Sequence, residues 1–307
     1  MPNPVTRPTL AQLDLPLGKR TRLHRLLYEH GPANGTLLLL PIDQGLEHGP
    51  VDFFPNPPSQ DPDFELRLAQ EGGYSGIVFQ IGLAQKYMRD YAGSVPLVLK
   101  LNGKTAIPPA DHALSPCMAS VEDAVRLGAD AIGYTLYVGS PAQTEDFIQL
   151  GRIREEADRY AMPVIVWSYP RGSAVEAKGG QETLYAIEYA ARVANELGAD
   201  VVKLNLPKCD EGRLKTPKEY AAIEWDNHSD ADVTRITQRV VAAAGRALVL
   251  FSGGSKLGDE DLLAKAHACM AGGATGLIFG RNLWQREWPE ALAMTEKIKA
   301  VMAQYAV

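Results

Sequence analysis

The sequence predicts an α/β fold, and three observations favour one closed barrel of eight parallel strands. Eight short apolar runs alternate with segments of helical periodicity. The junctions at residues 126–130, 196–200 and 271–275 share a pattern in which a helical stretch ends in glycine and turns directly into an apolar run. The units fill about 270 residues without a linker rich in Pro, Gly or Ser. We therefore predict a single (β/α)8 TIM barrel, with an open doubly wound sheet as the alternative.

The predicted strands are short runs of aliphatic residues, the composition expected of parallel strands that are buried on both faces. Residues 71–75 form a looser copy of the glycine junction before the second run. Helical periodicity between the runs supplies the crossovers that parallel strands require. In chain order, the predicted strands are residues 37–42, 76–79, 96–101, 131–135, 164–167, 201–204, 247–251 and 276–279.

Two regions lie outside this alternation. We interpret residues 1–35 as an N-terminal extension and residues 36–307 as the barrel and catalytic domain. Residues 19–25 are strongly basic, and we expect a helix that packs across the bottom of the barrel with its charges facing solvent. Residues 208–232 form a long polar excursion after the sixth strand, on the face of a barrel where long loops tend to be functional.

Composition excludes several classes of protein. The 307 residues carry 31 Lys and Arg against 37 Asp and Glu, a net charge of −6 without a basic stripe, which argues against a nucleic-acid partner. Cys117, Cys209 and Cys269 are odd in number and lack metal-ligand spacing, so we expect reduced thiols. No apolar stretch approaches the roughly 18 residues of a membrane span, and the first residues do not resemble a signal peptide. We expect a cytoplasmic protein that binds no membrane.

Lys203 is a lysine within an apolar run that otherwise reads as a buried parallel strand. Burial lowers the pKa of an ammonium group, and a lysine with a lowered pKa offers a free amine for Schiff-base chemistry. The alternative is a lysine whose ammonium reaches solvent or pairs with Asp43 or Glu47. Lys100 is the competing nucleophile, because it also lies near the end of an apolar run.

Other candidate residues follow the predicted strands, where the side chains of a barrel converge on one mouth. Asp43 follows the first strand and is expected to face Lys203 across the mouth, where it orients the amine or a substrate hydroxyl. Trp167 and Tyr169 alternate along the fifth strand, so both can point inward. A tyrosine hydroxyl beside a lysine can donate and accept protons. From its position alone, His48 is expected to be a structural histidine with its hydrogen bonds satisfied rather than a base.

A phosphate site is predicted from two consecutive strand ends. Ser252, Gly253 and Gly254 follow the seventh strand, and Gly280 and Arg281 follow the eighth. Glycine exposes backbone N–H groups, and the seventh and eighth loops are the usual phosphate cradle of phosphate-binding barrels. A simple tight turn is the alternative for either loop alone. Both together point to one phosphate monoester.

No cofactor or metal is expected. The six histidines lack zinc-ligand spacing, and only His48 lies at a predicted strand end. The sequence also lacks a GxGxxG motif after its first strand and a GxxxxGK[ST] motif, the patterns typical of dinucleotide and nucleoside-triphosphate sites.

Taken in order and spacing, several motifs resemble the archaeal-type class I fructose-1,6-bisphosphate aldolases. They are residues 43–50, 167–172, 202–203, 252–255 and 279–282. The resemblance covers roughly residues 36–300 and implies a Schiff base on Lys203, with Tyr169 as proton donor and acceptor and Asp43 assisting at the substrate. It also implies a homo-oligomer of several subunits without a metal. In addition, it implies that a substrate pocket is formed by Trp167, Arg171, His48, Ser252, Gly253, Gly254, Gly280 and Arg281.

The residues and the resemblance together predict the cleavage of fructose 1,6-bisphosphate to dihydroxyacetone phosphate and glyceraldehyde 3-phosphate. One alternative is a related lysine-barrel aldolase, transaldolase or thiolase acting on another phosphorylated ketose. The other is a barrel that binds a phosphorylated sugar without catalysis.

Overall fold

The computed structural model describes residues 7–306 and shows a closed barrel in which all eight strands run parallel in chain order. This confirms the predicted (β/α)8 fold and rules out the open sheet, because β8 pairs with β1. The strands are β1 Leu37–Pro41, β2 Gly76–Gln80, β3 Leu97–Lys100, β4 Ala131–Val138, β5 Val164–Pro170, β6 Val201–Leu204, β7 Leu248–Ser252 and β8 Gly276–Ile278.

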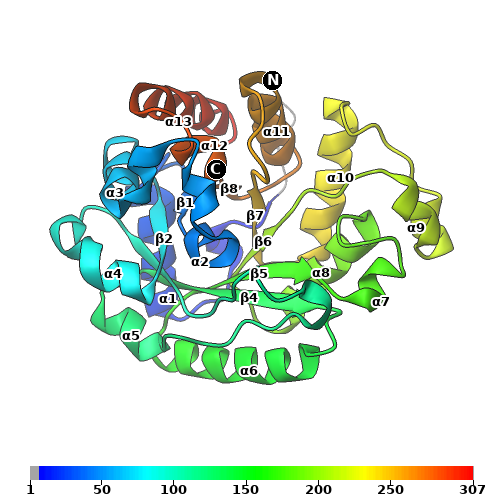
Figure 1. Ribbon diagram of the computed structural model, residues 1–307, viewed down its shortest axis with the longest axis horizontal. Coiled ribbons are helices and arrows are strands. Elements are labelled where there is room, and N and C mark those ends of the chain that lie inside the picture. The colour runs from blue at the N-terminus through cyan, green and yellow to red at the C-terminus, as the bar shows by residue number, and fades with distance from the viewer. Residues whose placement is uncertain (1–6, 307) are drawn as a thin grey trace.

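Helices surround the barrel as an outer ring (Figure 1). The ring helices are α3 Pro62–Glu71, α4 Ile81–Tyr87, α5 Val121–Arg126, α6 Gln143–Arg159, α8 Leu184–Glu196, α10 Asp230–Ala243, α11 Asp259–Ala271 and α13 Trp288–Ala303. Shorter helices occupy the N-terminal region and the loops: α1 Leu17–His24, α2 Gln44–His48, α7 Ser173–Glu176, α9 Lys218–Ala221 and α12 Arg281–Trp284. A π-helical turn, η2 Arg25–Glu29, follows α1, and 3-10 turns are η1 Leu10–Gln12, η3 Pro50–Phe53, η4 Pro57–Gln60, η5 Met88–Tyr91, η6 Ala110–His112 and η7 Glu211–Lys215.

The repeated glycine junctions end their helices as predicted. Gly128, Gly198 and Gly273 have φ angles of 68°, 93° and 95°, in the left-handed region that glycine adopts without a steric penalty. Side-chain caps begin four of the ring helices: Asp61 caps α3, Ser120 caps α5, Thr183 caps α8 and Ser229 caps α10, each by accepting from a backbone N–H of the first turn. Local sequence therefore fixes where helices stop and strands begin.

The core has two layers, one on the outer face of the barrel sheet and one inside the barrel. Residues on the outer face of the strands pack against the ring helices. Alternate residues fill the barrel interior, where Val98, Ile165, Trp167 and Leu250 belong to one cluster. This alternation is the period-2 pattern of a strand, and it carries Trp167 and then Tyr169 toward the interior, as the sequence predicts.

The basic segment before β1 closes the N-terminal end of the barrel, and its charges are solvated only in part. The Lys19 ammonium is buried and lies 2.9 Å from both Asp158 and Asp200, and Arg25 lies 2.8 Å from Asp130. Asp130 and Asp200 belong to the repeated junctions. The expectation of a solvated face holds for Arg20 and His24, which are exposed. It was wrong for Lys19 and Arg25, because the carboxylates at the strand entrances attract these two side chains inward.

Within the described residues, no helix is both long and apolar enough to cross a membrane. The three cysteines are unpaired, as predicted.

Candidate active site

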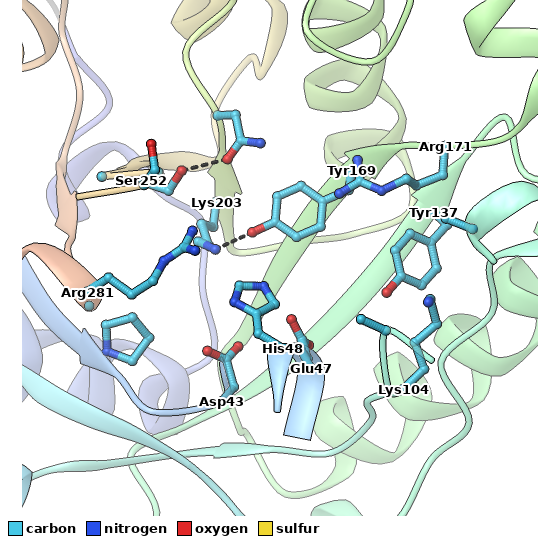
Figure 2. Close-up of a pocket in the computed structure, with 18 of the residues that line it drawn as sticks. Asp43, Glu47, His48, Lys104, Tyr137, Tyr169, Arg171, Lys203, Ser252 and Arg281 are labelled. Atoms are coloured by element: carbon cyan, nitrogen blue, oxygen red, sulfur yellow. Dashed lines mark hydrogen bonds between the residues drawn. The ribbon is translucent and has the colours of Figure 1, made fainter. Parts of the chain in front are cut away.

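A cavity of about 550 Å³ opens at the carboxyl ends of the strands (Figure 2). Most of the residues predicted at strand ends line it, which places the mouth of the barrel where the sequence located it. The predicted residues that line the cavity are Asp43, His48, Tyr169, Arg171, Lys203, Ser252, Gly253, Gly254, Gly280 and Arg281.

Lys203 projects from β6 and donates a hydrogen bond to the phenolic oxygen of Tyr169. Its side chain is buried. Burial lowers the pKa of Lys203 to about 8; the negative charges of Asp43 and Glu47 oppose this shift, and the nearby cation of Lys100 adds to it. A lysine with this pKa carries a substantial fraction of free amine near neutral pH.

Lys100, the competing lysine, has the opposite environment. It is fully buried on β3, and its Nζ atom lies 3.0 Å from a Glu47 oxygen and 3.3 Å from an Asp43 oxygen. Burial alone would lower the pKa of Lys100, but the two carboxylates outweigh burial and raise it. Lys100 therefore remains an ammonium ion. Ion pairing with Asp43 and Glu47, which the sequence left open for Lys203, is instead observed for Lys100.

The sequence predicts that Asp43 faces Lys203. In the structure, the Asp43 carboxylate belongs to the same charged group as Lys203, but it forms its ion pair with Lys100. Burial would raise the pKa of Asp43, but the cations of Lys100 and Lys203 lower it overall. Asp43 is thus an anion held by Lys100, from where its field still acts on Lys203.

Trp167 lies beneath both ammonium groups rather than in the cavity wall. The Nζ atoms of Lys100 and Lys203 are 4.9 and 5.5 Å from the centre of its ring. Gly133 of β4 leaves room for this arrangement, because a Cβ atom there would lie 2.8 Å from the Trp167 ring and 2.9 Å from the Lys100 side chain. Trp167 therefore shapes the floor of the site.

Tyr169 is held as a neutral phenol beside Lys203. Burial raises its pKa, and the anions Glu47 and Asp43 raise it further. Arg171, two residues along the same strand end, lies over the Tyr169 ring at 5.2 Å from its centre. A neutral phenol in hydrogen-bond contact with the amine is placed to donate a proton to a group bound at that nitrogen.

The predicted phosphate loops lie together on one side of Lys203. Ser252 donates to the Asn205 side chain at 2.6 Å, and Gly253 and Gly254 continue the cavity wall toward Gly280 and Arg281. His48 is exposed at the rim, where its Nδ1 atom lies 2.7 Å from Asp52. Arg281 provides the charge and the glycines provide the backbone N–H groups that a phosphate requires.

The opposite side of the cavity contains residues that the sequence did not identify. Lys104 and Tyr137 lie on this side together with Arg171 (Figure 2). Ala106, Pro108, Pro109, Ala110 and Glu182 also line the cavity. No residue from 208–232 lines the cavity, so the structure does not support the expected functional role of that loop. One signal was available, because about 20 residues separate the end of β3 from α5, a long connection on the catalytic face.

Among residues 7–306, no group of three or more His, Cys, Asp or Glu side chains is arranged to hold a metal ion.

Comparison with known proteins identifies close relatives. The model of the DeoC/LacD family of aldolases matches residues 37–286. The class 1 fructose-bisphosphate aldolase of Thermoproteus tenax is 42% identical over 253 residues, which cover 82% of this chain and 84% of the relative. A protein of Methanocaldococcus jannaschii, described as a fructose-bisphosphate aldolase and 6-deoxy-5-ketofructose 1-phosphate synthase, is 30% identical over 299 residues, covering 94% of this chain and 88% of the relative.

Solved structures give the same result. An archaeal fructose-1,6-bisphosphate aldolase, solved with its catalytic lysine covalently bound to the carbinolamine intermediate of the substrate, matches with a TM-score of 0.77 and 37% identity. The match covers 92% of this chain and 99% of that structure. A fructose-bisphosphate aldolase from Slackia heliotrinireducens matches with a TM-score of 0.81 and 28% identity, covering 97% and 92% of the two chains.

Proposed function

The chain belongs to the DeoC/LacD family of aldolases, and we propose that it is a Schiff-base, class I fructose-1,6-bisphosphate aldolase with Lys203 as its nucleophile. The observation that supports this most strongly is the contrast between its two buried lysines. Lys203 has a pKa lowered to about 8 and a phenol in contact, whereas Lys100 is bound to two carboxylates.

The first steps form the Schiff base. The neutral amine of Lys203 attacks the ketone carbon, its proton passes to the carbonyl oxygen, and a carbinolamine results. Tyr169 donates its phenolic proton to the hydroxyl group, water leaves, and the nitrogen lone pair forms an iminium ion. The Asp43 and Glu47 carboxylates lie close enough to stabilise this cation electrostatically, since they already act on the Lys203 nitrogen.

The next steps break the C3–C4 bond. The Tyr169 phenolate takes the proton of the C4 hydroxyl, and the C4 oxygen becomes an aldehyde as the C3–C4 electron pair moves toward the iminium. The product on Lys203 is a neutral enamine, and glyceraldehyde 3-phosphate leaves. Tyr169 then protonates C3, water hydrolyses the resulting iminium, and dihydroxyacetone phosphate leaves with the amine restored.

The cavity accommodates a substrate with a phosphate at each end. We place the phosphate next to the ketone at Gly253, Gly254 and Arg281, and the distal phosphate at Lys104 and Arg171. These cationic groups lie on opposite sides of Lys203 (Figure 2). A chain of −6 net charge needs such local cations to hold a bisphosphate against its overall field.

A second candidate is the synthesis of another phosphorylated ketose. The Methanocaldococcus jannaschii relative is described as a 6-deoxy-5-ketofructose 1-phosphate synthase as well as an aldolase, and a lysine enamine can attack other aldehydes by the same chemistry. We further propose a cytoplasmic homo-oligomer. The unpaired cysteines fit a reducing compartment, and Ile148 and Tyr189, exposed on α6 and α8, offer apolar surface to a second subunit. Sedimentation analysis tests the assembly.

A coupled assay of fructose 1,6-bisphosphate cleavage tests the main proposal. The purified protein should produce both triose phosphates without an added metal and with EDTA present. Fructose 1-phosphate and unphosphorylated fructose, assayed in parallel, report how far each phosphate contributes. Turnover that stops completely with EDTA, or no turnover of the bisphosphate beside turnover of another phosphorylated ketose, would contradict it.

A further inference from the structure

Lys265 of α11 lies behind the Gly253–Gly254 loop, outside the cavity. Its Nζ atom donates to the carbonyl oxygen of Gly253 at 3.1 Å. Among residues 7–306, Lys265 forms no ion pair within 4.0 Å. The Glu182 carboxylate, which acts on it electrostatically, is already paired with Lys208 at 2.7 Å. Lys265 is thus a partly buried cation behind the loop, and its hydrogen bond goes to a neutral carbonyl.

This bond fixes the direction of one peptide group. The described residues contain no cis peptide bonds, and in a trans peptide the C=O and N–H bonds point in opposite directions. The Gly253 carbonyl points to Lys265, behind the loop, so the Gly254 N–H points away from α11. Gly254, with φ +74°, also lines the cavity. The ammonium group further polarises this peptide and strengthens its N–H as a donor.

The far side of the loop is held independently. The Asn282 side chain donates to Ser255 at 3.2 Å and accepts from the backbone N–H of Leu257 at 2.8 Å. Because Asn282 already fixes the loop's path, removal of the Lys265 ammonium should change the orientation and charge of one peptide rather than unfold the loop.

We propose that Lys265 is a positioning residue of the phosphate site: it aims the Gly254 N–H at the substrate phosphate and supplies, from behind the loop, a positive charge that the phosphate neutralises. The inference rests on the proposed function, since it takes this loop to bind the phosphate next to the ketone. It extends that function by assigning the bound phosphate a counter-charge, the Lys265 ammonium group, that does not touch it.

A purely structural role for Lys265 and a role in phosphate binding predict different effects of its removal on the stability of the free enzyme. If Lys265 only anchors the loop, its removal should destabilise the free enzyme. If its ammonium serves the phosphate, the free enzyme carries an uncompensated, partly buried charge, and an uncharged residue of similar length should leave stability unchanged or raise it. Burial lowers the pKa of Lys265, which agrees with an unfavourable environment for the cation.

The experiment compares Lys265→Met, which removes charge and donor, with Lys265→Gln, which removes the charge and keeps an N–H donor on a side chain one atom shorter. Lys299→Met is the matched control, because Lys299 also donates to a backbone carbonyl at 3.1 Å, that of Gly72, outside the active-site cavity. Borohydride trapping is measured with dihydroxyacetone phosphate and with unphosphorylated dihydroxyacetone. Thermal unfolding is measured with and without inorganic phosphate.

We expect Lys265→Met to need roughly 10-fold more dihydroxyacetone phosphate for half-maximal trapping, with dihydroxyacetone unaffected. Its stabilisation by inorganic phosphate should shrink, its unfolding temperature without ligand should not fall, and Lys265→Gln should be intermediate. Lys299→Met should bind both ligands as the wild type does.

Two results would overturn the inference while leaving the aldolase proposal intact. One is unchanged dihydroxyacetone phosphate dependence in both Lys265 variants. The other is an equal loss with both ligands accompanied by a lower unfolding temperature, which would mark a structural anchor. If the wild-type protein is trapped with neither ligand, the proposed function itself fails, and the inference fails with it.

Discussion

Lys100 and Lys203 share one aromatic ring but differ in charge. Their Nζ atoms lie 4.9 and 5.5 Å from the centre of the Trp167 ring. Lys100 binds the carboxylates of Asp43 and Glu47, and Lys203 contacts a neutral phenol. Burial lowers the pKa of Lys203 to about 8 against the opposing charges of Asp43 and Glu47, and the nearby cation of Lys100 lowers it further. Lys100 thereby contributes to making Lys203 a nucleophile.

The pH dependence of trapping should follow from this. An amine attacks only when unprotonated, so the rate of adduct formation should fall as pH decreases below the Lys203 pKa of about 8. Asp43→Asn removes an anion that raises this pKa, and the midpoint of the acidic limb should therefore move to lower pH. Initial trapping rates between pH 5.5 and 9.5 measure both. A trapping rate that still rises steeply through pH 9.5 without levelling off, as expected for an ordinary lysine with a pKa of about 10.4, would contradict the assignment.

Tyr169→Phe should lower kcat by about 10²–10⁴, the usual contribution of a general acid–base group. The phenylalanine keeps the ring that lies below Arg171 and loses only the hydroxyl that contacts Lys203. Circular dichroism and steady-state kinetics should show an intact fold with a slow reaction. A loss of less than about threefold would move the proton-transfer role to another group, with Asp43 and His48 next to be tested.

Gly133→Ala should displace the floor of the site. Its added Cβ would lie within 3.0 Å of both the Trp167 ring and the Lys100 side chain. We expect a loss of about 1–3 kcal/mol in the free energy of unfolding, together with a change in tryptophan fluorescence and lower activity.

Gly151→Ala is the matched control for Gly133→Ala. Gly151 lies within α6, where an added Cβ meets nothing within 4 Å. Urea unfolding should show that this variant is as stable as the wild type or up to about 1 kcal/mol more stable. Equal stabilities for the two variants would show that Gly133 does not set the packing of Trp167.

Arg281→Ala should weaken binding of the phosphate next to the ketone. Loss of a charge-assisted hydrogen bond of about 1.5–3 kcal/mol should raise KM roughly 10- to 100-fold. The effect should appear with both fructose 1,6-bisphosphate and fructose 1-phosphate, because each carries that phosphate, while turnover of unphosphorylated fructose is spared. An effect confined to the bisphosphate would mean that the substrate lies in the opposite orientation across the cavity.

The sequence predicts the barrel well because the fold depends on local signals. Apolar runs mark all eight strands, and glycines at residues 128, 198 and 273 mark where helices turn into them. That the two glycine loops and Lys203 line one cavity is predictable for the same reason, since the position of a strand end determines which mouth a residue faces.

The relations between strands could not be predicted in this way. Which lysine binds Asp43 and Glu47 depends on how side chains from β3, from β6 and from the segment after β1 reach across the interior. The role of Gly133 could not be predicted from local sequence, because it depends on the space that the absence of a side chain leaves for Trp167 on the neighbouring strand. Lys104 belongs to a loop whose path over the cavity is set by packing rather than by local sequence.

The most direct test of the central claim is to identify the lysine that bonds to substrate. The protein is incubated with dihydroxyacetone phosphate, reduced with borohydride, digested and analysed by mass spectrometry. Lys100 serves as an internal control, because it is buried at the same ring but held as an ammonium ion. We predict one reduced adduct on Lys203, loss of activity in proportion to it, and no effect of EDTA. An adduct on Lys100, Lys104 or Lys256, or none on Lys203, would contradict the account.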